Sequence, residues 1–320
     1  MILLPHVPAK RWRWRGQQAL LLLLLSLAGL PALSAHAELE EQIEQATAAI
    51  AKDPTNARLR LGRAELYRLH EQFDEAFADL EVAAGLDTTL EEIEFVRAKL
   101  YVDLKYRSAA RTAFDHYLAR VPAAVEAYLA RARLFADLQE IPLAIADYSQ
   151  AIAHSKQPLP EYFIERARLE LLKGGGGPAA AVKGLDEGIA KIGPIVTLEL
   201  PAKDLDLAAG RYDAALARID LLMQASDRKE THLEIRGAIL EQAGRKEAAL
   251  TAYREALTSL AKAPEGAQVT SASQALKTRL QQRIESLINP PPAIATPAAP
   301  TPRTLPQAPA SSGTPAPTNP

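Results

Sequence analysis

Residues 125–155 read VEAYLARARLFADLQEIPLAIADYSQAIAHS, and this stretch decides the fold. Apolar or small side chains recur at Tyr128, Ala132 and Phe135, on one face of a helix with a period of 3.6 residues. A second set with the same period fills residues 141–152, and the segment between the two sets is largely polar. The stretch therefore predicts two amphipathic helices joined by a tight turn. One such hairpin leaves an apolar face uncovered, so it needs further copies stacked on either side.

Copies of this hairpin recur along the chain, and each is marked by an arginine followed by a small residue. The marked arginines are Arg63, Arg97, Arg131, Arg166 and Arg236. They are separated by 34, 34, 35 and 70 residues, and the pair Pro201-Ala202 stands at the midpoint of the last interval. This period and pattern resemble the tetratricopeptide repeat, a helix–turn–helix unit of 34 residues.

The resemblance covers residues 57–260, and three units carry its most specific matches. In the first unit the matching residues are Tyr67, Phe73, Ala76, Leu80 and Ala83. In the second they are Ala98, Tyr101, Ala110, Phe114 and Pro122. In the sixth they are Gly237, Gly244, Ala249, Tyr253 and Ala256. With the leader segment described below, the chain resembles an exported bacterial member of this family.

The resemblance implies an all-α fold, a right-handed solenoid of about six helix–turn–helix repeats with capping helices. The expected units are residues 57–90, 91–124, 125–159, 160–194, 195–228 and 229–260. An N-terminal capping helix is expected within residues 38–56. Residues 261–288 are expected to form a connector and a C-terminal capping helix.

Two units depart from the repeat pattern. The fourth carries Gly174–Gly177, which predicts a flexible turn and not a phosphate loop, because no Gly-Lys-Ser/Thr sequence leads into the next helix. The fifth has Pro201 inside its first helix, where proline removes a hydrogen bond. We therefore expect that helix to be kinked or shortened.

The two ends of the chain differ from the repeats. Residues 1–37 combine a basic cluster, a short apolar core and the sequence Ala35-His36-Ala37, which is typical of a secretory signal peptide. The core is shorter than the roughly 20 residues of a spanning helix. We therefore expect cleavage after Ala37, general secretory export to a bacterial periplasm, and no membrane span in the mature chain. The alternatives are an uncleaved membrane anchor, and association of the exported chain with the cell wall or outer membrane. Residues 289–320 contain 11 prolines, which predicts a disordered tail.

Composition argues against several kinds of chemistry. The chain has no cysteine, which excludes disulfides, thiol catalysis and cysteine zinc sites. Its formal net charge of −2 does not suit nucleic acid, which needs a clustered basic face. The four histidines after the leader are far apart in sequence, so no metal site is expected. No catalytic constellation or cofactor motif is recognisable, and we expect no enzymatic activity, no cofactor and no small-molecule substrate.

The repeated arginines have two interpretations. They could line a surface as a ladder for anions. Alternatively, each could pair with an acid on the second helix of its own unit, because Asp79 and Asp147 follow Arg63 and Arg131 at the same offset of 16 residues. We favour the structural pairing, in which a partly exposed pair contributes about 0–1 kcal/mol.

Candidate binding residues stand at a constant distance from each arginine. Two positions before it lie the apolar residues Leu61, Phe95, Leu129 and Ile164. Two positions after it lie Glu65, Lys99, Arg133 and Arg168. In the family that the chain resembles, first helices line a concave groove. There these residues would form an apolar track with a basic edge, suited to an extended or helical peptide with apolar anchors and acidic groups. The alternative is that the apolar stripe packs between neighbouring helices.

These features favour a non-enzymatic scaffold of the bacterial cell envelope that binds a protein or peptide partner in the groove. The alternative is a structural protein that self-associates, or that is tethered to the cell wall by its proline-rich tail.

Overall fold

Helices make up the regular secondary structure of the computed structural model, which describes residues 36–172, 177–264 and 270–290. The described part of the first helix covers residues 36–52. The others are α2 (Ala57–Leu69), α3 (Phe73–Leu86), α4 (Glu92–Asp103), α5 (Arg107–Arg120), α6 (Val125–Asp137), α7 (Ile141–His154), α8 (Pro160–Leu172), α9 (Gly177–Ile192), α10 (Val196–Ala208), α11 (Tyr212–Gln224), α12 (Glu230–Gln242), α13 (Lys246–Lys262) and α15 (Ser271–Ile288). No strand occurs within these ranges, and the all-α prediction is confirmed for them.

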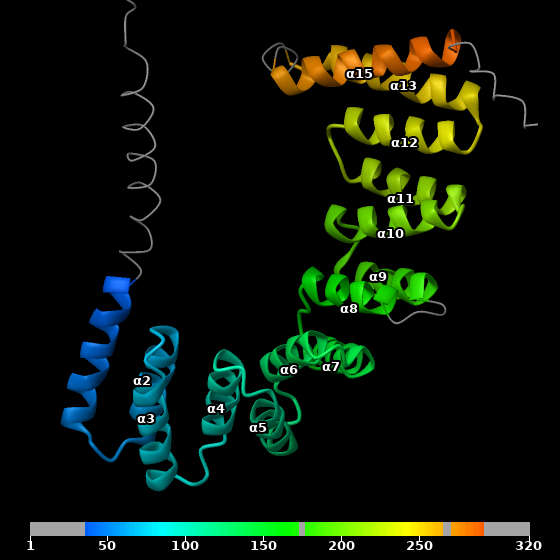
Figure 1. The fold of residues 1–320 in the computed structure, drawn as a ribbon. Coiled ribbons are helices and arrows are strands. Elements are labelled where there is room, and N and C mark those ends of the chain that lie inside the picture. The colour runs from blue at the N-terminus through cyan, green and yellow to red at the C-terminus, as the bar shows by residue number, and fades with distance from the viewer. Residues whose placement is uncertain (1–35, 173–176, 265–269, 291–320) are drawn as a thin grey trace, which may run out of the picture. The chain divides into compact units, whose positions relative to one another are not determined.

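The chain divides into two compact units, residues 1–227 and 228–320. In the first unit, consecutive helices pack as the hairpins α2–α3, α4–α5, α6–α7, α8–α9 and α10–α11, which Figure 1 shows in chain order from cyan to green. In the second unit α12 packs on α13, and α13 packs on α15. These six hairpins confirm the expected helix–turn–helix solenoid. The expected leader core and most of the proline-rich tail lie outside the described residues.

Small residues lie where the two helices of each hairpin cross. The residue after each marker arginine is buried in every unit, as is the small residue that faces it on the second helix. The first set is Ala64, Ala98, Ala132, Ala167, Ala202 and Gly237. In the sixth hairpin the glycine is required, because a Cβ atom on Gly237 would lie 2.3 Å from the ring of the fully buried Tyr253. The small residues let the two helix backbones approach closely. Large side chains beside the crossing then fill the remaining space in the core.

The five hairpin turns that the structure describes in full share one geometry. In each, a residue adopts a left-handed backbone conformation, which ends the first helix. These residues are Glu71, Lys105, Gln139, Gly210 and Gly244, with φ between 60° and 73°. The following N–H donates to a carbonyl five residues back at 2.8 Å in all five turns, as in the bond from Gln72 to Tyr67. This repeated bond directs the second helix back along the first.

The fifth hairpin corrects one expectation. Helix α10 continues through Pro201 and is 13 residues long, the same length as α2, α6, α8 and α12. The helix is therefore not shortened, and the kink, the other expected outcome, stays a prediction. Packing on α9 and α11 holds the helix together despite the hydrogen bond that proline removes.

Candidate functional site

The eight candidate binding residues lie on α2, α4, α6 and α8, the first helices of four consecutive hairpins. Neighbouring first helices touch directly between α2 and α4, and between α4 and α6. A row of residues at equal offsets on these helices therefore crosses from one repeat to the next.

The apolar members of the row are largely covered by their own hairpins. Leu129 is only 2% exposed and belongs to the core between α6 and α7. Leu61 and Ile164 are partly buried against the cores of the first and fourth hairpins. Phe95 is also partly buried, and its ring stacks on Tyr117 with centroids 5.2 Å apart. Leu129 thus packs within the protein, while the other three keep part of their surface accessible.

The charged members form a contact between the first two repeats. Glu65 on α2 accepts hydrogen bonds from Lys99 on α4 and from Arg68 on its own helix. Arg68 also donates to Asp103 at 2.5 Å, and the Lys99 ammonium lies 4.8 Å from the centroid of the Phe95 ring. Arg68 and Asp103 were absent from the sequence prediction. Their spacing of 35 residues, close to one repeat, is the signal that could have found them.

The electrostatics of Glu65 follow from these contacts. Burial raises the pKa of the Glu65 carboxyl, but hydrogen bonds from Arg68 and Lys99 outweigh burial and hold the pKa below its ordinary value. The carboxylate is therefore charged at neutral pH. Farther along the row, Arg133 and Arg168 are exposed, and Arg168 pairs with Glu165 at 2.6 Å. The basic edge is thus exposed to solvent on α6 and α8, where Glu165 pairs with Arg168, and it is largely covered and paired with Glu65 on α4.

Arg63, Arg131 and Arg166 each pair with an acid on the second helix of their own hairpin, as the structural interpretation predicts. Arg97 pairs instead with Glu81 on the preceding hairpin and with Glu94 on its own helix. Arg63 donates its Nε to Asp79 Oδ2 at 2.6 Å, and Arg131 donates its Nε to Asp147 Oδ2 at 2.7 Å. Arg131 also reaches back to Asp115 on the preceding hairpin at 2.5 Å. The Arg131 guanidinium therefore links α6 to α7, the second helix of the same hairpin, and to α5, the second helix of the preceding hairpin.

In the fifth hairpin the arginine lies on the second helix and the acids lie on the first, the reverse of the arrangement in the first and third hairpins. This reversal was not predicted from the sequence. Arg218, on the second helix α11, donates to Glu199 and Asp206 on the first helix α10 and pairs with Asp186 on α9. Glu199 and Asp206 are each 1% exposed. Burial lowers the pKa of Arg218, but its hydrogen bonds to the three carboxylates outweigh burial and raise it. The arginine missing at Pro201 is replaced from the opposite helix.

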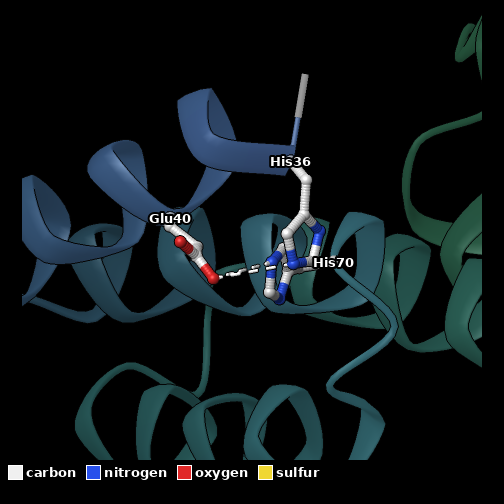
Figure 2. A group of neighbouring side chains, drawn as sticks. All are labelled: His36, Glu40 and His70. Atoms are coloured by element: carbon white, nitrogen blue, oxygen red, sulfur yellow. Dashed lines mark ion pairs between the residues drawn. The ribbon is translucent and has the colours of Figure 1, made fainter. Parts of the chain in front are cut away.

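A separate group lies where the helix of residues 36–52 meets the end of α2 (Figure 2). The rings of His36 and His70 stack with centroids 4.1 Å apart. Glu40 Oε1 is 3.5 Å from His36 Nε2 and 3.9 Å from His70 Nε2. Among the described residues, neither ring nitrogen of His70 has a hydrogen-bond partner.

Two imidazoles and a carboxylate are ligands that suit zinc, and one ligand atom from each of the three residues lies within 4.8 Å of the others. No sequence pattern connects these residues, because His36 falls within the expected leader and His70 within the first repeat. Cleavage after Ala37 would leave only Glu40 and His70, so the complete group requires a chain that retains residue 36.

Comparison with known proteins agrees with this geometry. Residues 95–158 match the family model described as a tetratricopeptide repeat. No curated protein matches the chain.

Among solved structures, the C-terminal part of a TPR repeat-containing protein from Cytophaga hutchinsonii gives a TM-score of 0.52 at 16% identity, covering 72% of this chain and 93% of that one. A tetratricopeptide repeat protein from Parabacteroides merdae gives 0.42 at 20% identity, covering 86% of this chain and 100% of that one.

Fold and matched residues together define the class as a solenoid of helical hairpins. Residues 95–158 match the tetratricopeptide repeat, and the described hairpins on both sides of them have the same helix–turn–helix fold. This fold is one that proteins use to bind other proteins. In the described part of the chain, no helix is both long and apolar enough to cross a membrane.

Proposed function

We propose that the protein is a non-enzymatic scaffold of the bacterial cell envelope that binds an extended or helical peptide along α2, α4, α6 and α8. The peptide would place acidic groups on the basic edge and apolar side chains on the accessible parts of Leu61, Phe95 and Ile164. Leu129 supports this surface from within the core and makes no direct contact.

The observation that carries the proposal is the contact between Glu65 and Lys99 over the Phe95 ring. It places charge, aromatic surface and two successive first helices at one point, where an elongated ligand can touch both repeats. Arg133 and Arg168 extend the row with exposed positive charge. Exposed charges of this kind steer a complementary partner and set its register.

The proposal is tested by a photo-crosslinking amino acid at Phe95 or Arg133 in cells. Gln150, exposed on the second helix α7, serves as the control position. We expect one dominant partner from the two groove positions and none from Gln150. Crosslinks only between copies of this chain would favour self-association instead.

The captured partner is then used to test the basic edge. Arg133→Glu combined with Arg168→Glu should raise Kd at least tenfold, or about 1.4 kcal/mol, because both charges meet acidic groups of the peptide. Arg107→Glu combined with Lys156→Glu changes the net charge equally at exposed positions outside the first helices, and should leave Kd unchanged. Equal effects of the two pairs would contradict the groove, with circular dichroism confirming that both variants fold.

A further inference from the structure

The second hairpin lacks an acid that its neighbours have. In the first and third hairpins the marker arginine donates its Nε to an aspartate 16 residues later, at 2.6 and 2.7 Å. Those aspartates, Asp79 and Asp147, are 3% and 4% exposed. In the second hairpin the same position is Ala113, which is also 4% exposed. The place of the buried carboxylate is therefore held by a methyl group.

The arginine of the second hairpin keeps its other contacts. Arg97 donates one terminal nitrogen to Glu94 at 2.5 Å and the other to Glu81 at 2.9 Å. Within the part of the chain that the structure describes, its hydrogen bonds come from the two terminal nitrogens and none comes from Nε. This is the atom that bonds to aspartate in the first and third hairpins.

A hollow of about 380 Å³ lies beside Ala113, between α4 and α5. Besides Ala113 and Arg97, its wall includes Tyr101, Ser108, Thr112 and His116, which carry hydroxyl or imidazole groups. The one acid in the wall, Glu94, already accepts from Arg97. The hollow thus combines an unfilled arginine donor with hydroxyl groups around it.

We propose that this hollow binds a carboxylate, which takes the place of the missing aspartate against Arg97 Nε. The source that the surroundings favour is an aspartate or glutamate side chain of a bound polypeptide, since protein partners are what this fold binds. The residues that line the hollow differ from the eight candidate residues of the groove. Binding at the hollow can therefore be tested independently of binding in the groove.

Arg97 already has two acidic partners, and a third must be tolerated. Arg218 shows that this chain accommodates three carboxylates around one guanidinium, with Asp186 at 2.8 Å, Asp206 at 2.7 Å and Glu199 at 3.1 Å. In addition, the Glu81 side chain is 70% exposed, so solvent screens its charge. A third carboxylate at Arg97 is therefore electrostatically reasonable.

The binding test follows the Arg97 Nε–H resonance by nuclear magnetic resonance while acetyl-Ala-Asp-Ala-amide is added to the full chain. We expect a saturable shift with the aspartate peptide and none with acetyl-Ala-Asn-Ala-amide, which has the same shape without the charge. Acetate forms the third arm. Tighter binding of the peptide identifies a polypeptide source, and equal or tighter binding of acetate identifies a free carboxylate. Equal shifts with the two peptides would overturn the proposal.

Ala113→Asp fills the hollow from within. Its carboxylate should pair with Arg97 as Asp79 and Asp147 pair with their arginines, so we expect peptide binding to weaken at least tenfold while Tm is kept or raised. Ala110→Asp is the matched control, because Ala110 is fully buried on the same helix and outside this wall. Its unpaired charge should lower Tm by about 10 °C. If Ala113→Asp lowers Tm equally, or leaves peptide binding intact, the proposal is wrong.

Discussion

Asp147 and Asp115 bond to the same guanidinium, that of Arg131, but they are buried to different degrees. The Asp147 side chain is 6% exposed and the Asp115 side chain is 48% exposed. A buried carboxylate has lost its water, so it depends on the arginine for both charge and hydrogen bonds. An exposed carboxylate exchanges its bond to arginine for bonds to solvent at small cost. Burial, and not the presence of a bond, therefore decides what each pair contributes.

Asp147→Asn should lower the free energy of unfolding by about 2–3 kcal/mol. The asparagine amide is uncharged and cannot replace a carboxylate that accepts two hydrogen bonds from Arg131. Asp115→Asn should cost less than about 1 kcal/mol. Urea unfolding followed by circular dichroism measures both. Equal losses in the two variants would show that burial does not control the strength of these pairs.

At the scale of the element, the hairpin turn limits which residues the repeat accepts. Five described left-handed positions lie at the ends of first helices, and two of these five are the glycines Gly210 and Gly244. Gly193, also with a positive φ, follows the second helix α9. Glu71, Lys105 and Gln139 adopt the same conformation without glycine. Side chains at such φ values are strained, so these three turns store a cost that packing of the hairpin offsets.

Gly210→Ala should lower the free energy of unfolding by about 1–2 kcal/mol, since φ is +70° although nothing lies within 4 Å of the new methyl group. Gly62→Ala is the matched control. Gly62 lies inside α2, also with nothing within 4 Å, and alanine there should raise stability by about 0.5–1 kcal/mol. Opposite signs in thermal unfolding are expected, and equal signs would contradict the role of the turn.

At the scale of the whole molecule, the first described helix crosses the expected cleavage point. Residues 36 and 37 belong to this helix, and the ring of His36 stacks on that of His70. Removal of residues 1–37 would therefore shorten this helix and take away one member of the His36–Glu40–His70 group. A chain that has been cleaved after Ala37 cannot contain the complete group of His36, Glu40 and His70.

We expect the protein recovered from the periplasm to begin at Glu38, because the leader has the features that a signal peptidase recognises. Intact-mass measurement of that fraction is the test. A mass corresponding to the uncut chain of 34.6 kDa would contradict cleavage. Ala37→Lys replaces the small residue at the cleavage point, and should retain the leader.

Much of the fold could be predicted because its determinants are local. The positions of the hairpins follow from helical periodicity, and the partners Asp79 and Asp147 follow from the fixed register within a hairpin. The course of α10 through Pro201 could not be predicted in this way. Neighbouring helices supply the stability that local propensity lacks there.

The candidate site was less accessible to prediction, because it depends on contacts between hairpins. Sequence offsets placed Leu129 and Phe95 in one stripe, yet one is core and the other is partly accessible. The bond between Glu65 and Lys99 forms only because two first helices approach each other. The hollow beside Ala113 exists only because no other side chain fills the space that an aspartate occupies in the first and third hairpins.

The sequence by itself determined an array of six helical hairpins with small residues at their crossings, since these features depend on periods of 3.6 and 34 residues. Only the tertiary structure decided which side chains are reachable and which charges are already paired. The reason is physical: burial and ion pairing depend on distances between helices, and a repeat period along the chain does not specify those distances.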